Sequence, residues 1–198
     1  MEAKQVANVA RIFKDNLLIP LAQAGILNAE ITRQAATEYI DEIQQRGTGN
    51  KIIEVSQDGE LRLLHPYTVN KFTLLGKEWL SIEHFYQAAA YFGVDDEFAE
   101  SIRACATPQL AHRKALNALQ SFKMQRADWD TARMIELDRA YRQMMRTYDE
   151  AYNVLRATGS AKIVFPTTSD KFLGVSEDGT GKNVLGEVLI TIRNSVKL

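Results

Sequence analysis

The stretch GKEWLSIEHFYQAAAYF, residues 76–92, places a Glu-His pair and a glutamine among residues that are mainly aromatic or small and apolar. Polar groups in such surroundings cost free energy unless they find hydrogen-bond partners. Ser81 is a suitable cap for a helix over most of IEHFYQAAAYF. On that helix Glu83 and Gln87 share one face, because residues four apart stack on each other. The stretch therefore predicts a helix with one apolar face toward the core and a second face that carries a carboxylate and an amide.

The face that carries Glu83 and Gln87 has two interpretations. With only small alanines beside them, the two side chains can form the wall of a polar ligand site, or the face is an exposed surface with a half-buried glutamate. His84 and Glu83 do not form a metal pair, because adjacent helical residues do not face each other and the HExxH spacing is absent. His65 and His112 have no Cys or His nearby at ligand spacing. We therefore expect neither a metal nor a tightly held organic cofactor.

The composition is typical of a soluble globular protein, and we expect a cytoplasmic one. The 198 residues are 45% hydrophobic and 25% charged, and the formal net charge is −1. A general nucleic-acid or membrane-surface binder would need a basic excess. No apolar run approaches the roughly 20 residues that cross a bilayer, and the charged start MEAKQVANVARIFKD is unlike a signal peptide. The single cysteine, Cys105, is expected to pack as a small hydrophobe in a helical core position.

The order of the segments predicts an α+β fold, a mostly helical single domain around a small sheet. KIIEV and ELRLL flank SQDG, which indicates a β-hairpin, and TVNKFTLLG continues as an extended stretch. Thr107 and Pro108 are a cap followed by proline at the first helical position. The further expected elements are helices in DDEFAESIRACA and TPQLAHRKALNALQSF, one long helix or two over residues 127–159, a short strand in AKIVF and a final helix in NVLGEVLITIRN.

Residues 1–50 are expected to form an N-terminal helical extension before a main domain at 51–198. Apolar residues recur at helical spacing in two runs within residues 2–46, and RGTGN breaks the pattern. Two amphipathic helices need something to cover their apolar stripes. We therefore expect them to pack on the main domain, on a second copy of the chain or on another protein.

A second polar stretch, DKFLGVSEDGTGKNVLGEVL, covers residues 170–189 and enters the final helix. Its glycines allow backbone N–H groups to approach a ligand closely, and a helix start attracts anions such as phosphate. Asn183 is a suitable cap for that helix. GTGKN has neither the Walker spacing nor its Ser or Thr, and no ordinary βαβ unit surrounds the loop. The stretch is thus neither a P-loop nor a Rossmann fingerprint.

Trp129 opens the long helix in RADWDTARM, where Asp128 can cap the helix. The indole either closes over the base of a ligand or packs in the core. The sequence leaves both assignments open.

Taken together, these segments resemble the NADAR (NAD- and ADP-ribose-associated), or YbiA-like, family. The resemblance rests on GKEW and EHFYQA, a later TP, W-D, ATG and a D…G…DGxGxNxLG loop before the last helix. It covers roughly residues 63–193 with consistent spacing. Family members are N-glycosidases, some of which cleave ribosylaminopyrimidine intermediates of the riboflavin pathway, while others remove ADP-ribose from guanine bases. The resemblance thus implies a compact α+β domain with a pocket for a phosphorylated ribosyl or ADP-ribosyl compound.

The resemblance also implies roles for individual residues. Hydrolysis of an N-glycosidic bond needs stabilisation of positive charge at the anomeric carbon and a polarised nucleophile. Glu83 and Asp170 are the residues expected to act catalytically. The residues expected to bind substrate are His84, Gln87, Trp129, Gly174, Asp178, Gly179, Gly181 and Asn183.

The chain departs from the family pattern at several polar positions. Ala90 stands where the family has lysine, Pro66 lies in the place of its Ser-Asn-Phe element, and Phe165 and Leu173 replace an acidic residue and a tryptophan. Losing one member of a catalytic unit typically costs orders of magnitude in rate. The alternative to an N-glycosidase is therefore a catalytically degenerate member that acts as a nucleotide-binding or protein-assembly module. An enzyme should present Glu83 and Asp170 in one cleft near a cation, whereas Phe165 or Leu173 should fill the cleft of a degenerate member.

Overall fold

The computed structural model describes residues 51–168 and 170–195 of the chain. The two helices predicted within residues 2–46 lie outside the described residues, so the extension and its partner surface stay predictions. The described residues from 52 to 158 and from 162 to 195 belong to one compact unit. No helix in this described part is long and apolar enough to span a bilayer.

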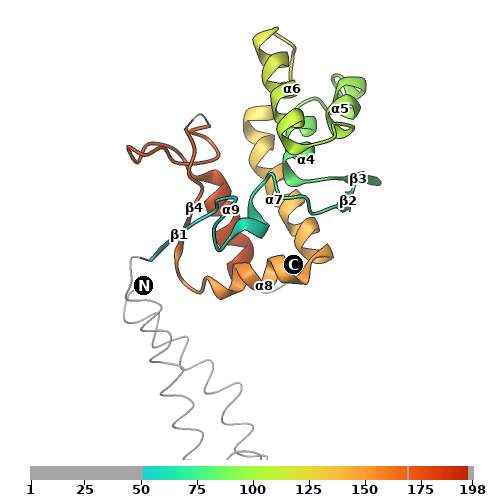
Figure 1. Cartoon of the computed structure of the whole chain (residues 1–198). Helices are drawn as coiled ribbons and strands as arrows, with labels where there is room; N and C mark the ends of the chain where they lie inside the picture. The colour runs from blue at the N-terminus through green and yellow to red at the C-terminus, as the bar shows by residue number, and fades with distance from the viewer. Residues whose placement is uncertain (1–50, 169, 196–198) are drawn as a thin grey trace, which may run out of the picture. The chain divides into compact units, whose positions relative to one another are not determined.

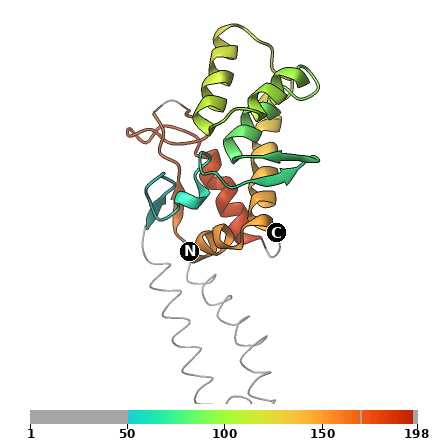
Figure 2. The same cartoon turned by 45° about the vertical axis from the view of Figure 1, so that its right-hand side comes forward.

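The unit is α+β and mostly helical, as predicted, with short strands at two places (Figures 1 and 2). Strands β1 and β4 pair in parallel, and β2 and β3 pair antiparallel. Helix α7 packs against both α4 and α9, and α4 also packs against α5 and α6. The bounds are β1 Ile52–Glu54, the 3₁₀ helix η2 Arg62–Leu64, β2 Phe72–Leu74, β3 Lys77–Trp79, α4 Ile82–Ala89, α5 Asp96–Arg103, α6 Pro108–Gln120, α7 Trp129–Thr147, α8 Asp149–Ala157, β4 Lys162–Val164 and α9 Val184–Asn194.

The β-hairpin predicted around SQDG is wrong. The first run is indeed a strand, but β1 pairs with β4, more than a hundred residues later, and the second run contains η2. Leu61 and Leu64 are both buried. Residues three apart lie on the same side of a 3₁₀ turn, so this spacing buries both leucines, whereas a strand would need alternation.

Helix α4 forms where the sequence predicts it. Ser81 is its N-cap, and its Oγ accepts a hydrogen bond from the backbone N–H of His84 at 3.4 Å. Phe85, on the inward face, is fully buried and makes an edge contact with Trp79 at a ring separation of 5.0 Å. This aromatic packing fixes the helix axis and so determines where Glu83 and Gln87 point.

The long helical segment is two helices. Tyr148 is extended, with φ −125° and ψ 91°, and separates α7 from α8. Tyr141 of α7 is fully buried and donates a hydrogen bond from its hydroxyl to the Leu64 carbonyl at 2.7 Å. This contact ties η2, and the chain that follows it, to the helical core.

Candidate functional site

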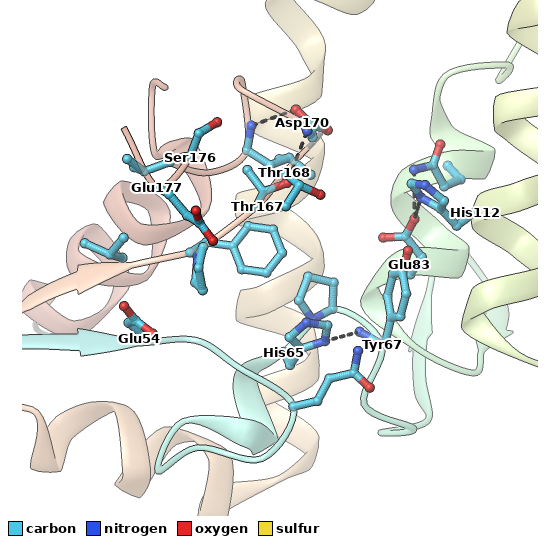
Figure 3. A pocket seen from close by; sticks show the side chains of 18 residues that line it. Glu54, His65, Tyr67, Glu83, His112, Thr167, Thr168, Asp170, Ser176 and Glu177 are labelled. Carbon is cyan, nitrogen blue, oxygen red and sulfur yellow. Dashed lines mark hydrogen bonds and ion pairs between the residues drawn. The ribbon is translucent and has the colours of Figure 1, made fainter. Parts of the chain in front are cut away.

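A cavity of about 560 Å³ opens where several distant segments meet (Figure 3). Its lining comes from the end of β1, residues 65–67 after η2, the polar face of α4, His112 of α6 and residues within 164–168 and 170–177. Its volume lies within the usual range for small-molecule sites, about 300–1,000 Å³. The cavity is thus large enough for a nucleoside-sized ligand.

Glu83 forms the α4 wall of the cavity. Its Oε1 accepts a hydrogen bond from Gln87 Nε2 at 2.8 Å, which confirms that the two side chains share a face. The same oxygen lies 2.8 Å from Nδ1 of His112 on α6. The side chain of Glu83 is only 4% exposed, whereas that of His112 is 38% exposed. A nearly buried carboxylate is therefore held by two partners from two helices, and one of these partners can carry a positive charge.

Rings form the wall next to Glu83. Tyr67 makes an edge contact with His65 at a centroid separation of 5.3 Å and lies 5.9 Å from the ring of His112. On its other side His65 meets Phe165 at 5.6 Å. The backbone N–H of Tyr67 donates to Nδ1 of His65 at 3.1 Å, which fixes the orientation of the imidazole. Such a row of ring edges and faces suits a planar base.

The surroundings move the pKa values of these rings in opposite directions. The hydrogen bond to Glu83 raises the pKa of His112, because the carboxylate stabilises the imidazolium. Burial lowers the pKa of His65, so that ring is neutral near pH 7. Burial and the charge of Glu83 both raise the pKa of the Tyr67 hydroxyl, which therefore keeps its proton. His112 is thus the side chain of this wall that favours its charged form.

Asp170 brings a second carboxylate to the cavity, from the loop before α9 (Figure 3). Its Oδ1 accepts hydrogen bonds from the backbone N–H groups of Phe172 at 3.0 Å and Leu173 at 2.9 Å. Two bonds to one oxygen fix the carboxylate and leave Oδ2 for other contacts. After burial, Asp170 is the largest cause that raises the pKa of the Tyr86 hydroxyl, and Glu83 acts in the same direction. The charges of both carboxylates therefore reach one tyrosine.

We expected His84 of α4 and Trp129 of α7 at the site, but the structure places both side chains outside the cavity. His84 is fully buried on the core side, with Nδ1 2.9 Å from Ser81 Oγ and Nε2 3.1 Å from the Cys105 carbonyl. Cys105 itself is half-buried beyond the end of α5, and not in a helical core position as predicted. Trp129 packs on Tyr86 at a ring separation of 5.3 Å. His84 and Trp129 therefore shape the surroundings of the site through packing and hydrogen bonds.

Residues of the expected ligand loop also make hydrogen bonds that support the fold. Asn183 precedes α9 with φ 52° and makes no side-chain cap. Its amide instead accepts from the N–H of Phe165 at 3.0 Å and donates to the carbonyl of Ile163 at 2.8 Å. Asp178 accepts from the backbone N–H of Thr180 at 2.9 Å within an exposed turn. Asn183 therefore holds the loop against β4, whereas Asp178 stabilises the turn in which it lies.

Two of the loop glycines are required by close packing of the backbone. A Cβ on Gly174 would lie 2.2 Å from the Phe165 carbonyl oxygen, and one on Gly181 would lie 2.1 Å from the Gly174 oxygen. Gly179 meets no such neighbour and adopts φ +78° in the turn. The glycines thus let residues 165–167 and 173–175 lie side by side, which positions the loop wall of the cavity.

The residues that differ from the family pattern do not fill the cavity. Phe165 and Leu173 lie in its wall and Pro66 lines it as well. Ala90 lies in the core at 1% exposure, and its carbonyl accepts from the N–H of Arg126 at 2.8 Å. The basic side chain near Glu83 is His112, which our sequence analysis considered only as a metal ligand. No spacing could have revealed it, because His112 lies 29 residues from Glu83 and reaches it only through the packing of α6 on α4.

The model of the NADAR domain matches residues 51–197. The chain belongs to the NADAR domain family. Among similar proteins, the N-glycosidase YbiA of Shigella boydii serotype 4 (strain Sb227) is 31% identical over 123 residues, which cover 62% of this chain and 74% of that protein. The chloroplastic riboflavin biosynthesis protein PYRR of Zea mays is 28% identical over 60% of this chain, a match that spans only 20% of the maize protein.

A solved structure resembles this NADAR domain as well. The NMR structure of Escherichia coli YbiA superposes with a TM-score of 0.61 at 28% sequence identity and covers 73% of this chain and 83% of that one. The fold described above is therefore that of YbiA, and the family expected from the sequence motifs is confirmed.

Proposed function

We propose that this NADAR domain is a hydrolase that cleaves the N-glycosidic bond of a ribosylated base. The substrate class that the family implies is a phosphorylated ribosyl or ADP-ribosyl compound. The observation that carries the proposal is the buried carboxylate of Glu83, held by Gln87 and His112 at the wall of an open cavity that Asp170 also lines. Similar proteins named N-glycosidases support it.

Each carboxylate has a role in this reaction. As the glycosidic bond breaks, its electron pair passes to the base nitrogen and positive charge develops at the anomeric carbon. The carboxylate of Asp170, fixed by two backbone N–H groups, stabilises that charge. Water then adds to the anomeric carbon and gives a proton to Glu83, which acts as general base; the proton balance closes when Glu83 releases its proton and the departing base takes one up on the nitrogen that received the electron pair. Gln87 and His112 keep the Glu83 carboxylate in place without occupying Oε2.

The aromatic side chains in the wall of the cavity provide a surface for the base of the substrate. His65, Tyr67 and Phe165 present aromatic surface to the cavity, on which a planar base can pack. Burial keeps His65 neutral near pH 7, so this ring is available as a hydrogen-bond partner for a base edge.

The alternative function is a degenerate member that binds a nucleotide or assembles with a protein. That function predicted a cleft filled by Phe165 or Leu173, whereas both residues lie in the wall of an open cavity. His112, a basic side chain whose pKa is raised by its hydrogen bond to Glu83, lies beside that carboxylate, where the catalytic hypothesis expected a cation. Both observations favour the hydrolase.

The direct test is release of the free base from a panel of N-ribosylated compounds, with and without phosphate, measured by liquid chromatography. We expect Glu83→Gln to lower turnover by about 10²- to 10⁴-fold with the fold intact, because the amide cannot accept the proton. Glu187→Gln, at an exposed position of α9, is the matched control and should behave as the wild type. Unchanged turnover in Glu83→Gln would contradict the role of this carboxylate, and absence of base release from every compound would contradict the proposed function.

A further inference from the structure

The proposed reaction needs a proton for the departing base, and the groups in the wall of the cavity differ in how well they can give one. A neutral base leaves with the electron pair of the glycosidic bond, so a ring nitrogen has to be protonated as the bond breaks. An ionised carboxylate has no proton to give, and hydroxyl and amide groups are very weak acids. Among the described residues of the lining, the remaining proton donors are Tyr67, His65 and His112.

Tyr67 and His65 are poorly suited to this role. Burial and the charge of Glu83 raise the pKa of the Tyr67 hydroxyl, which therefore holds its proton tightly. Burial lowers the pKa of His65, so that imidazole is neutral near pH 7 and has no imidazolium proton to release. Nδ1 of His65 is also occupied, because it accepts the backbone N–H of Tyr67 at 3.1 Å. His112 is the donor that remains.

The position of His112 suits a proton donor to the base (Figure 3). Its Nδ1 lies 2.8 Å from Oε1 of Glu83, whereas Nε2 has no hydrogen-bond partner in the part of the chain that the structure describes. The imidazole lines the cavity 5.9 Å from the ring of Tyr67, one of the aromatic side chains on which a base can pack. A base packed on Tyr67 therefore lies next to the imidazole of His112.

The charges around His112 favour its imidazolium form. The hydrogen bond to Glu83 of α4 is the largest cause that raises the pKa of His112, and the charge of Asp170 acts in the same direction, while burial opposes them. Tyr67 is the titratable group that faces the imidazole from residues 65–67, and its hydroxyl stays neutral. Both nitrogens of an imidazolium are donors, so Glu83 holds the Nδ1 proton and the Nε2 proton is available to a ligand.

We propose that His112 is the general acid that protonates the departing base through Nε2. This inference rests on the proposed function and adds a catalytic residue to it. As the bond between the anomeric carbon and the ring nitrogen breaks, its electron pair stays with the base, which takes the Nε2 proton and leaves as a neutral molecule. Water then adds to the anomeric carbon and gives its proton to Oε2 of Glu83. Glu83 afterwards releases that proton to solvent and His112 takes one up, which restores both groups.

The contact between His112 and Glu83 couples the two proton transfers. In the proposed reaction the glycosidic bond breaks before water adds, so His112 acts first and Glu83 acts second. Once the imidazole is neutral, the carboxylate no longer has a positive charge beside it and attracts the proton of water more strongly. The same pair of residues therefore serves the departure of the base and then the addition of water.

The first test compares two ribosides whose bases differ in their need for a proton. One is the neutral-base compound that the wild type hydrolyses fastest, and the other is nicotinamide riboside with the same phosphorylation, a pyridinium that the electron pair alone neutralises. His112→Asn keeps a donor toward Glu83 but has no acidic proton. We expect it to lower kcat/KM by about tenfold or more beyond the loss on the pyridinium when the base is neutral.

The matched control for this comparison is Arg113→Gln. Arg113 is an exposed residue of the same helix and does not line the cavity, so its loss removes a positive charge from α6 without touching the site. This variant should leave both rates unchanged. Equal losses on the two compounds in His112→Asn would show that His112 only fixes Glu83 or supports the fold, and would overturn the proposal.

A second measurement needs only the compound with the neutral base. The side chain of His112 is 38% exposed, so His112→Ala leaves a space that added imidazole can enter from solvent. We expect imidazole to restore turnover in proportion to the concentration of its protonated form. Restoration that is the same above and below the pKa of the added imidazole would show that it only fills space, and would contradict the acid.

The same experiments separate this inference from the proposed function. Base release by the wild type, with equal losses on both compounds in His112→Asn, would contradict only the role of His112. Hydrolysis by the wild type of the pyridinium alone would contradict that role as well, since no acid would then act on a neutral base. Absence of base release from every compound would contradict the proposed function itself.

Discussion

Nδ1 of His112 lies 2.8 Å from Oε1 of Glu83, so α6 supplies the partner of a carboxylate that α4 carries. The carboxylate is nearly buried, and the imidazole reaches it from the more exposed side. A buried charge needs a partner to stay ionised, and here Gln87 and His112 share one oxygen while the other remains available. This arrangement combines a stable anion with a reactive atom, which is what a general base requires.

The first prediction concerns the catalytic effect of that pair. His112→Asn keeps a neutral hydrogen-bond donor near Glu83 but removes the positive charge. We expect kcat to fall by about 10- to 100-fold, because Glu83 is less well fixed and its ionised form loses its counter-charge. The measurement is kcat and KM for base release as a function of pH. A purely structural role for His112 would lower stability but leave the pH profile of kcat unchanged, and that result would contradict the prediction.

The second prediction concerns stability and pH. Glu83 raises the pKa of His112 in the folded state. A group whose pKa is higher when folded contributes stability that is complete below its unfolded pKa, about 6.5 for histidine, and that is lost as pH rises through the folded pKa. We therefore expect wild type to exceed His112→Asn in free energy of unfolding by about 1 kcal/mol near pH 6, because solvent screens the half-exposed imidazole, and by less near pH 9.

Urea denaturation at several pH values measures this difference. The same series on Glu83→Gln supplies the control, because the pH-dependent effect of His112→Asn should become much smaller once the largest cause of the raised pKa is gone. A difference between wild type and His112→Asn that grows as pH rises would have the wrong sign and would contradict the ion pair.

Local signals in the sequence were sufficient for the helices. Ser81 before an apolar stripe, and Thr107 followed by Pro108, specify helix starts within a few residues, and both act as N-caps in the structure. The shared face of Glu83 and Gln87 follows from helical geometry alone. These features could be predicted because each depends on residues within about one turn of one another.

Features that depend on long-range contacts could not be predicted in the same way. The pairing of Ile53 with Ile163 joins segments more than a hundred residues apart, whereas the nearby turn motif SQDG indicated a local hairpin. Asn183 binds a backbone N–H and a carbonyl group of a segment about 20 residues earlier in the chain. The residues next to Asn183 do not reveal these partners, and they indicated a helix cap instead. His112 reaches the site by the same route, through the packing of two helices.

The third prediction tests the structural role of Asn183. Asn183→Ala leaves the N–H of Phe165 and the carbonyl of Ile163 without their partners. We expect the free energy of unfolding to fall by about 2 kcal/mol, since unpaired buried polar groups cost about 1–3 kcal/mol. Urea denaturation gives the value. Asn183→Gly is the control for the left-handed backbone, because glycine accepts φ 52° but has no amide, and wild-type stability in this variant would contradict the hydrogen-bonding role.

The fourth prediction separates two glycines of the same loop. Gly179 and Gly181 both have positive φ, at +78° and +139°, but a Cβ on Gly179 meets nothing within 4 Å, whereas one on Gly181 would lie 2.1 Å from the Gly174 oxygen. Gly179→Ala should cost about 1 kcal/mol for its backbone conformation alone. Gly181→Ala should cost about 3 kcal/mol or more, because the backbone at Gly174 has to move.

The two alanine variants should also differ at the cavity. A shift at Gly174 displaces its neighbours Leu173 and Val175, which line the cavity, so Gly181→Ala should weaken ligand binding as well as stability. Gly179→Ala should leave affinity unchanged, because Gly179 itself does not line the cavity and a Cβ there would meet no neighbour within 4 Å. Thermal unfolding measures the change in stability, and calorimetry with a hydrolysis-resistant carbocyclic analogue of an N-ribosylated base measures the affinity. Equal affinities in the two variants, with Gly181→Ala folded, would show that close packing at Gly181 does not position the cavity wall.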